Sequence, residues 1–160
     1  MYGNTRLPGI TVTEPYRPEG SIWRGFTQST WFRIVTVNGD SATGTPIPIG
    51  TIMKEFNDGT YIPMALSDII TGTAGLPGAR LVIVADSTGK TGTTETIDGA
   101  TGPETVKKSS SILVGTMGEV DQDRLIVGDK TWADLDDTQR KGLRTQLEAW
   151  NFQPVPVVQA

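Results

Sequence analysis

A glycine-rich turn that ends in Gly89-Lys90-Thr91 is the first feature of the sequence that could do chemistry. It follows the branched apolar run LVIV at Leu81, and a phosphate-binding loop likewise follows a strand and ends in Gly-Lys-Thr or Gly-Lys-Ser. That motif needs a glycine five residues before Gly89, where this chain has Val84, and a helix directly afterwards. The residues that follow, TGTTETIDGATGP, are rich in Thr and Gly, which are poor helix formers. We therefore predict that the segment binds no nucleotide and that the chain uses no cofactor.

Two groups of acidic residues could act as acid–base pairs or hold a metal ion. Asp121 and Asp123 alternate along a predicted strand, which would place both on one face, while Asp134, Asp136 and Asp137 crowd the start of a predicted helix. Catalysis would need one carboxyl group in an apolar pocket that raises its pKa, and the neighbouring sequence supplies none. The regular spacing of a calcium loop is absent as well. We interpret both groups as helix caps and solvated surface residues, and predict no catalytic or metal site.

The composition narrows the possible chemistry further, because the 160 residues include no His and no Cys. Ser-His-Asp and Cys-His nucleophiles, disulfides and iron–sulfur clusters are thereby excluded. A net charge of −4 and a pI of about 4.8 argue against nucleic-acid binding. The sequence lacks both a long apolar run and a signal-peptide pattern at its start. We expect a protein made in a cytoplasm, with neither nucleic acid nor membrane as a partner.

Residues 1–30 are predicted to form an extended arm, because Pro8, Pro15 and Pro18 exclude a long helix. The arm is nevertheless too apolar for a linker that stays in water. Its sizeable apolar residues, which are the candidate interface residues, are Leu7, Ile10, Val12, Tyr16, Ile22, Trp23 and Phe26. These side chains must be buried on the chain's own domain or on another chain, and the sequence leaves both possibilities open.

Residues 31–160 are predicted to form a β-rich domain. The run from Trp31 to Val37 is typical of a strand, and Gly50–Met64 predicts a hairpin around Asn57-Asp58-Gly59 in which Ile52 and Phe56 share a face. Residues 71–106 are rich in Thr and Gly. Within them only Leu81–Ala85 is predicted to be a buried strand, and the rest is predicted to be an exposed excursion.

The C-terminal part predicts two strands, a helix and a short edge strand. Ser110–Met117 and Glu119–Gly128 are the predicted strands, with Gly118 as a tight connection between them. Asp136 is followed three residues later by Gln139, the spacing of a capping box at a helix start. The apolar face of that helix consists of Leu143, Leu147 and Trp150. The predicted fold class is mainly β, a small β-barrel or β-sandwich-like domain with one C-terminal amphipathic helix and an extended N-terminal arm.

Two segments, PIPIGTIMKEFNDGTYIPM and SSILVGTMGEVDQDRLIVGDKTWADLDDTQRKGLRTQLEAWNFQPV, resemble the head decoration proteins of tailed bacteriophages, of which the lambda type is the best known. The resemblance covers residues 46–66 and 109–158. It lies in the pattern of predicted elements and not in a diagnostic motif. It implies a homotrimer on the outside of the virion capsid that contacts the major capsid protein and cements the mature shell. It also implies that the N-terminal arm is the part that reaches the capsid.

Two other functions remain open. A different virion structural protein, such as a tail-tube or fibre-base subunit, would share the Gly/Thr-rich β composition, and it would form rings or polymers by itself. A carboxylate-dependent enzyme would use Asp121, Asp123 or Glu119 as acid and base. We expect a structural protein and no enzyme.

Overall fold

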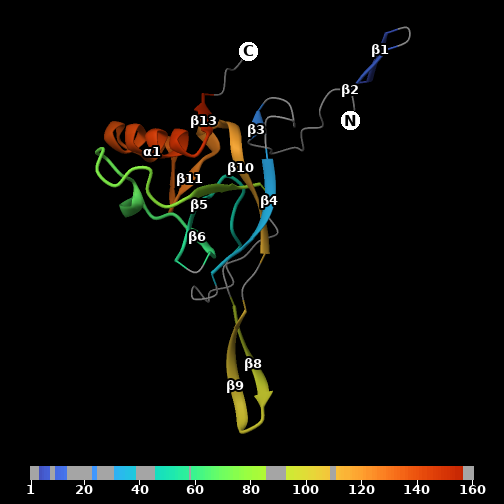
Figure 1. The fold of residues 1–160 in the computed structure, drawn as a ribbon, viewed down its shortest axis with the longest axis vertical. Coiled ribbons are helices and arrows are strands. Elements are labelled where there is room, and N and C mark those ends of the chain that lie inside the picture. The colour runs from blue at the N-terminus through green and yellow to red at the C-terminus, as the bar shows by residue number, and fades with distance from the viewer. Residues whose placement is uncertain are drawn as a thin grey trace.

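The computed structural model describes residues 4–7, 10–13, 23–24, 31–38, 46–57, 59–85, 93–108 and 111–156 (Figure 1). The elements, with η for a 3-10 helix, are β1 (Asn4–Leu7), β2 (Ile10–Thr13), β3 (Trp23–Arg24), β4 (Trp31–Thr36), β5 (Ile52–Glu55), β6 (Tyr61–Pro63), η2 (Leu66–Asp68), β7 (Leu81–Val84), β8 (Thr93–Gly99), β9 (Gly102–Lys108), β10 (Ser111–Asp121), η3 (Gln122–Arg124), β11 (Ile126–Val127), β12 (Lys130–Thr131), η4 (Trp132–Asp134), α1 (Asp137–Ala149) and β13 (Phe152–Val155). Strands dominate, and α1 is the one α-helix of the described residues, which confirms the predicted class.

The long strand β10 organises a seven-stranded sheet. Its first part pairs antiparallel with β4 and with β7, and β7 continues through β5 to β6. Its last four residues, Gly118–Asp121, pair in parallel with β13, and β3 pairs antiparallel with Glu119 and Val120. The sheet is strongly curved. Val37, just after β4, forms an isolated β-bridge with Tyr61 of β6, but the sheet does not close into a barrel.

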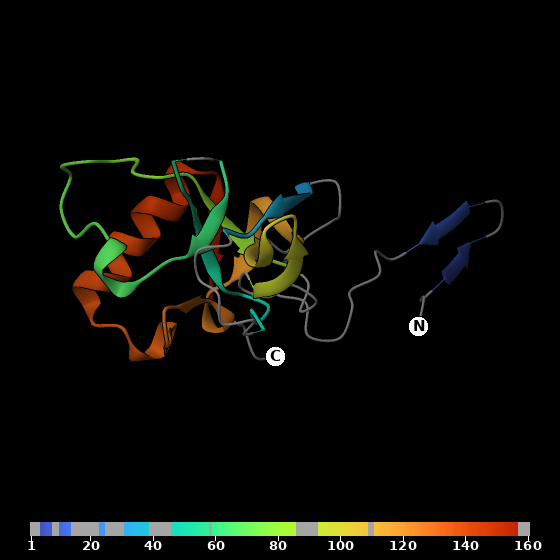
Figure 2. The same cartoon turned by 90° about the horizontal axis from the view of Figure 1, so that it is seen from below.

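Alternate strand residues enter two apolar clusters, because successive side chains of a strand point to opposite faces. The helix-side cluster includes Ile52, Leu81, Ile83, Val120, Leu143, Leu147 and Phe152. The inner cluster, inside the curl, includes Val35, Val37, Met53, Tyr61, Val82, Val84, Ile112 and Val114. Figure 2 shows α1 lying along one side of the sheet. The fold therefore has one sheet with an apolar cluster on each face.

Gly118 does not connect two strands, so that prediction is wrong. β10 runs without interruption from Ser111 to Asp121, and Gly118 lies inside it with φ of 126°. The ladder with β4 ends at Met117 after a shift in register, and the pairing with β13 begins at Gly118. A positive φ favours glycine, and here it falls where the strand changes partners.

Part of the Thr/Gly-rich segment also differs from its prediction. β7 is buried along its whole length, as expected. Residues 93–108, however, form the regular antiparallel hairpin β8–β9, from Thr93↔Lys108 to Gly99↔Gly102. Figure 1 shows this hairpin as a ribbon that projects from the body of the protein. The alternation of threonine with other residues, read as a loop, is compatible with strands because β-branched residues favour extended backbone.

The predicted hairpin at Gly50–Met64 is confirmed as β5 and β6, with Lys54 opposite Ile62. Pro63 ends β6, an edge strand of the sheet, where proline disturbs no further pairing. Ile52 is fully buried, whereas Phe56 is 43% exposed. Phe56 lies beyond the end of β5 at Glu55, so it is not buried with Ile52 as a shared strand face would require.

The helix begins and packs as predicted. The side chain of Asp136 accepts a hydrogen bond from the Gln139 N–H, and the Gln139 side chain accepts one from the Asp136 N–H, which forms the capping box. Leu143 and Leu147 are fully buried in the helix-side cluster. Trp150 lies at the C-cap and is only partly buried against the same cluster.

A buried amide fastens the exposed loop at residues 70–80 to α1. The Ile70 N–H donates to the Gln146 side-chain oxygen at 2.8 Å, and the Gln146 amide nitrogen donates to the Asp68 carbonyl at 3.2 Å. Gln146 is 2% exposed, so these bonds are shielded from water. Gly142 lets the start of this loop approach α1 closely, because a Cβ at Gly142 would lie 2.4 Å from the Ile70 carbonyl oxygen.

Substitution of Gly142 tests this close approach. Alanine would normally stabilise a helix interior by about 1 kcal/mol relative to glycine. At Gly142 the added methyl group must displace the Ile70 backbone, and overpacking of this kind costs about 1–3 kcal/mol. Because the 2.4 Å contact is with backbone, we take the upper end of that cost and expect Gly142→Ala to lower the free energy of unfolding by about 2 kcal/mol in urea denaturation. Gly72→Ala is the control, because a Cβ at Gly72 has no neighbour within 4 Å; equal stability of both variants would contradict the packing.

Candidate interaction surfaces and acidic clusters

The candidate arm residues are divided among several places. Leu7 lies in β1, Ile10 and Val12 lie in β2, and Trp23 lies in β3. Tyr16, Ile22 and Phe26 lie outside the described residues. The first described part of the arm is a hairpin instead of a single extended segment, with Leu7 opposite Ile10 and Thr5 opposite Val12.

The hairpin β1–β2 is a separate two-stranded sheet. Figures 1 and 2 both place it apart from the seven-stranded sheet. A lone two-stranded hairpin is at best marginally stable in water, and it gains stability from a further strand or a packed face. The hairpin is therefore suited to pairing with another surface.

The strand β3 joins the arm to the chain's own sheet. Trp23 pairs with Val120 and Arg24 pairs with Glu119, at the end of β10 where β13 also begins to pair. The described arm therefore has two parts. Trp23 and Arg24 belong to the domain's seven-stranded sheet, whereas β1 and β2 form a sheet of their own. Whether the apolar side chains of the arm are buried on their own domain or on another chain stays a prediction.

A second apolar surface lies on the edge strand β4, and the sequence did not single it out. Phe32 is 44% exposed and Ile34 is 70% exposed, although Val35 and Val37 of the same run are buried. The sequence offered one indication of this surface: the run from Trp31 to Val37 has apolar residues at both odd and even positions. A strand with a single solvated face would alternate apolar and polar residues, so apolar residues on both faces indicate a second contact.

Asp121 acts as a cap, as predicted, but it is buried instead of solvated at the surface. Asp121 ends β10 and accepts a hydrogen bond from the Asp123 N–H at 3.2 Å, so it caps η3. It also lies 3.8 Å from the Arg124 guanidinium. Asp123 belongs to η3, so the expectation that Asp121 and Asp123 share one face of a strand is wrong. The chain turns into a 3-10 helix immediately after Asp121.

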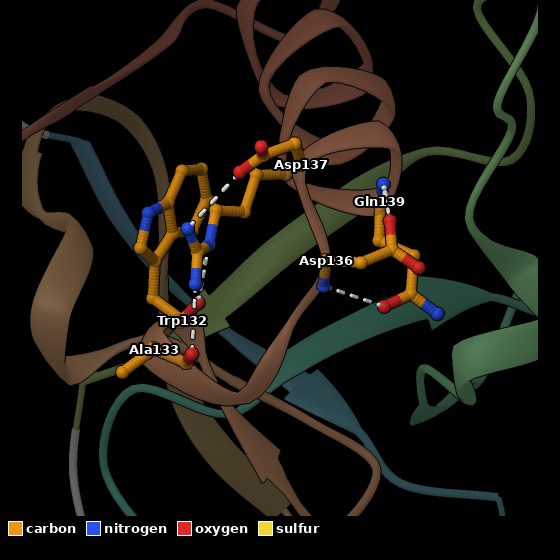
Figure 3. A network of polar contacts seen from close by, with 6 residues as sticks. Trp132, Ala133, Asp136, Asp137 and Gln139 are labelled. Atoms are coloured by element: carbon orange, nitrogen blue, oxygen red, sulfur yellow. Dashed lines mark hydrogen bonds and ion pairs between the residues drawn. The ribbon is translucent and has the colours of Figure 1, made fainter.

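The carboxylates near the helix start are held by short-range hydrogen bonds (Figure 3). The backbone N–H and then the hydroxyl of Thr131 hold the pKa of Asp134 below its usual value. Asp137 pairs with Arg140 at 3.3 Å, and Arg140 also donates to the carbonyl oxygens of Trp132 and Ala133. This lowered pKa keeps Asp134 ionised, whereas a general acid at neutral pH would need a raised one.

A shallow groove lies where β10, β13 and the end of α1 meet. Its volume is about 640 Å³, and its lining comprises Met117, Gly118, Glu119, Glu148, Asn151, Phe152, Gln153 and Pro154. The ionisable side chains of this lining, Glu119 and Glu148, are both acidic. Among the described residues, no three His, Cys, Asp or Glu side chains are grouped so that they could hold a metal ion. In the same part of the chain, no helix is long and apolar enough to cross a membrane.

The Gly89-Lys90-Thr91 turn lies outside the described residues. The next element described after β7 is the strand β8, whereas a phosphate-binding loop is followed by a helix. The absence of nucleotide binding stays a prediction. Comparisons of the chain with protein-family models, with curated proteins and with solved structures find no match.

Proposed function

We propose that this protein is a virion structural protein that binds the outer surface of a bacteriophage capsid as a trimer and stabilises the mature shell. The observation that carries the proposal is the separate hairpin β1–β2, which contains the apolar arm residues Leu7, Ile10 and Val12. Its isolated strands are suited to β-augmentation, in which backbone hydrogen bonds to a partner's sheet edge provide affinity. The partner is the major capsid protein.

The position of the resembling segments supports the proposal. The first contributes the hairpin β5–β6, and the second contributes β10, α1 and β13. These strands belong to one sheet, and residues from both segments enter the helix-side cluster beside α1. The resemblance to phage decoration proteins therefore covers part of the packed body of the domain, and the strands β4 and β7 and the arm lie outside it.

A trimer would make weak arm contacts effective. Each net backbone hydrogen bond contributes only about 1 kcal/mol, so a single short hairpin would bind weakly. Once one arm of a trimer is bound, the other two are held at a high local concentration near their own sites. Tight attachment then requires no large single interface.

Co-sedimentation with capsids tests the proposed function. Purified full-length protein is mixed with expanded, decoration-free heads of the phage that encodes it, and bound protein is measured over a range of concentrations. We expect saturable binding, regular projections in negative-stain images and greater resistance of the shells to heat. Heads incubated without the protein are the control. Failure to co-sediment would contradict the proposal, and rings or tubes formed without capsids would favour a tail-tube subunit.

A further inference from the structure

Four strands of the seven-stranded sheet pair with one neighbour only, among the strands that the structure describes: β3, β4, β6 and β13. The outer side of such a strand carries backbone N–H and C=O groups that can pair with a strand of another chain. β3 and β4 contain no proline, whereas β6 contains Pro63 and β13 contains Pro154. The backbone direction of each proline determines its effect on the outer side.

Pro154 directs its backbone to the outer side of β13. The Gly118 N–H donates to the Asn151 carbonyl at 3.0 Å, and Gly118 lies opposite Phe152 in the parallel ladder. Because the backbone groups of successive strand residues point to opposite sides of the strand, Gln153 faces β10 and Pro154 faces away from it. Proline has no N–H, so β13 offers no donor at this outward position.

The carbonyl group of Pro154 is occupied as well. The Arg144 guanidinium donates to it at 3.0 Å and to the Gln122 side chain at 2.8 Å. The guanidinium also lies 5.4 Å from the centre of the Trp132 ring, a cation–π distance. Hydrogen bonds from a charged donor are stronger than neutral ones, and the other two contacts hold this donor in place. At Pro154, the outer side of β13 therefore has no N–H, and its carbonyl is already bonded.

Pro63 has the equivalent position in β6. The Met64 N–H donates to the Ile52 carbonyl of β5 at 2.9 Å, so Met64 directs its backbone toward β5 and Pro63 directs its backbone away. Tyr61 also faces outward, and its carbonyl accepts a hydrogen bond from the Asn38 N–H at 2.9 Å. The outer side of β6 thus lacks a donor at Pro63 and has a bonded carbonyl at Tyr61.

We infer that Pro154 with Arg144, and Pro63, close β13 and β6 to a further strand, so that the sheet can pair with other chains only along β3 and β4. Pro154 is followed by Val155 within β13, so its role is not to end the strand. A sheet that pairs on two sides links copies into open-ended chains, whereas one that pairs on a single side stops after one contact. The closed strands thus keep the protein from polymerising through its sheet. This inference is independent of the proposed attachment to capsids.

Opening β13 by substitution tests the inference. In the double variant Pro154→Ala/Arg144→Met, an N–H returns to the outer side of β13 and the carbonyl loses its donor. Methionine keeps an apolar side chain beside Trp132. We expect sedimentation velocity to show a shift to species larger than those of the wild type, which grow with protein concentration and bind a dye that recognises stacked β-strands.

Pro48→Ala/Arg140→Met is the matched control. Pro48 is exposed and belongs to no strand. Arg140 lies one turn before Arg144 in α1, where it bonds the carbonyl groups of η4 instead of β13. We expect this variant to sediment like the wild type.

Thermal melting shows which variants are folded. Pro63→Thr opens β6 separately, and it alone decides the outcome where the double variant at β13 does not fold. Growth of larger species by either folded variant, and not by the control, supports the inference. Sedimentation like the wild type by both variants overturns it, and so does equal growth of the control.

Discussion

Leu147→Ala is expected to lower the free energy of unfolding by about 2–5 kcal/mol, because the substitution leaves a cavity in a closely packed cluster. Leu147 is fully buried, and its cluster draws residues from α1, from the sheet and from the segment after β10. The residues around Leu147 belong to different elements, so they cannot easily move together to fill the cavity that the substitution leaves. The loss is measured by urea denaturation with the wild type and the variant at the same pH.

Lys141→Ala is the control for that experiment. Lys141 lies in the same helix and its side chain is long, but the residue is exposed, so its truncation removes little buried contact. We expect a change within about 0.5 kcal/mol for this variant. A loss below about 0.5 kcal/mol for Leu147→Ala would show that the helix face is not packed on the sheet.

The features that the sequence predicted correctly are those that local chemistry determines. The capping box at Asp136 involves residues three positions apart, and the burial of Leu143 and Leu147 follows from helical spacing. The hairpin β5–β6 was predicted from a turn between two short apolar runs. Each of these signals lies within about a dozen residues, so no knowledge of distant partners is needed.

The errors occurred where distant pairing decides the structure. Gly118 has a positive φ, which a tight turn would also favour, but its place inside β10 follows from pairing with β13, which lies some thirty residues further on. The threonine-rich strands of β8 and β9 resemble a loop in composition, and their pairing with each other makes them a hairpin. Glycine and threonine allow both outcomes, so propensity alone cannot choose between them.

The candidate surfaces were only partly predictable for the same reason. The arm was identified because prolines among apolar residues are visible in the sequence. The exposure of Phe32 and Ile34 depends on which part of the sheet α1 packs against. No local sequence pattern encodes the position of that helix on the sheet. The division of the arm at β3 likewise depends on the edge of β10 that Trp23 and Arg24 join.

Deletion of residues 2–22 is expected to abolish attachment to capsids while the domain stays folded. The deletion removes β1–β2, which pairs with no other strand among the described residues, and it keeps β3 paired with β10. The seven-stranded sheet and its apolar clusters therefore remain complete, and the melting temperature should change little. Attachment should be lost because, in the proposed function, the arm supplies the strands that pair with the capsid protein, and the deletion removes the bonds of all three proposed arms together.

A second truncation that removes residues 2–30 isolates the contribution of β3. We expect it to bind no more than the first truncation and to melt at a slightly lower temperature, since it also loses the pairing of Trp23 with Val120. Both truncations are compared with the full-length chain by co-sedimentation with decoration-free capsids and by thermal melting. Full occupancy of capsids by the 2–22 truncation would show that the arm is not the anchor. Failure of that truncation to fold would show instead that the apolar residues of the arm belong to the core of the domain.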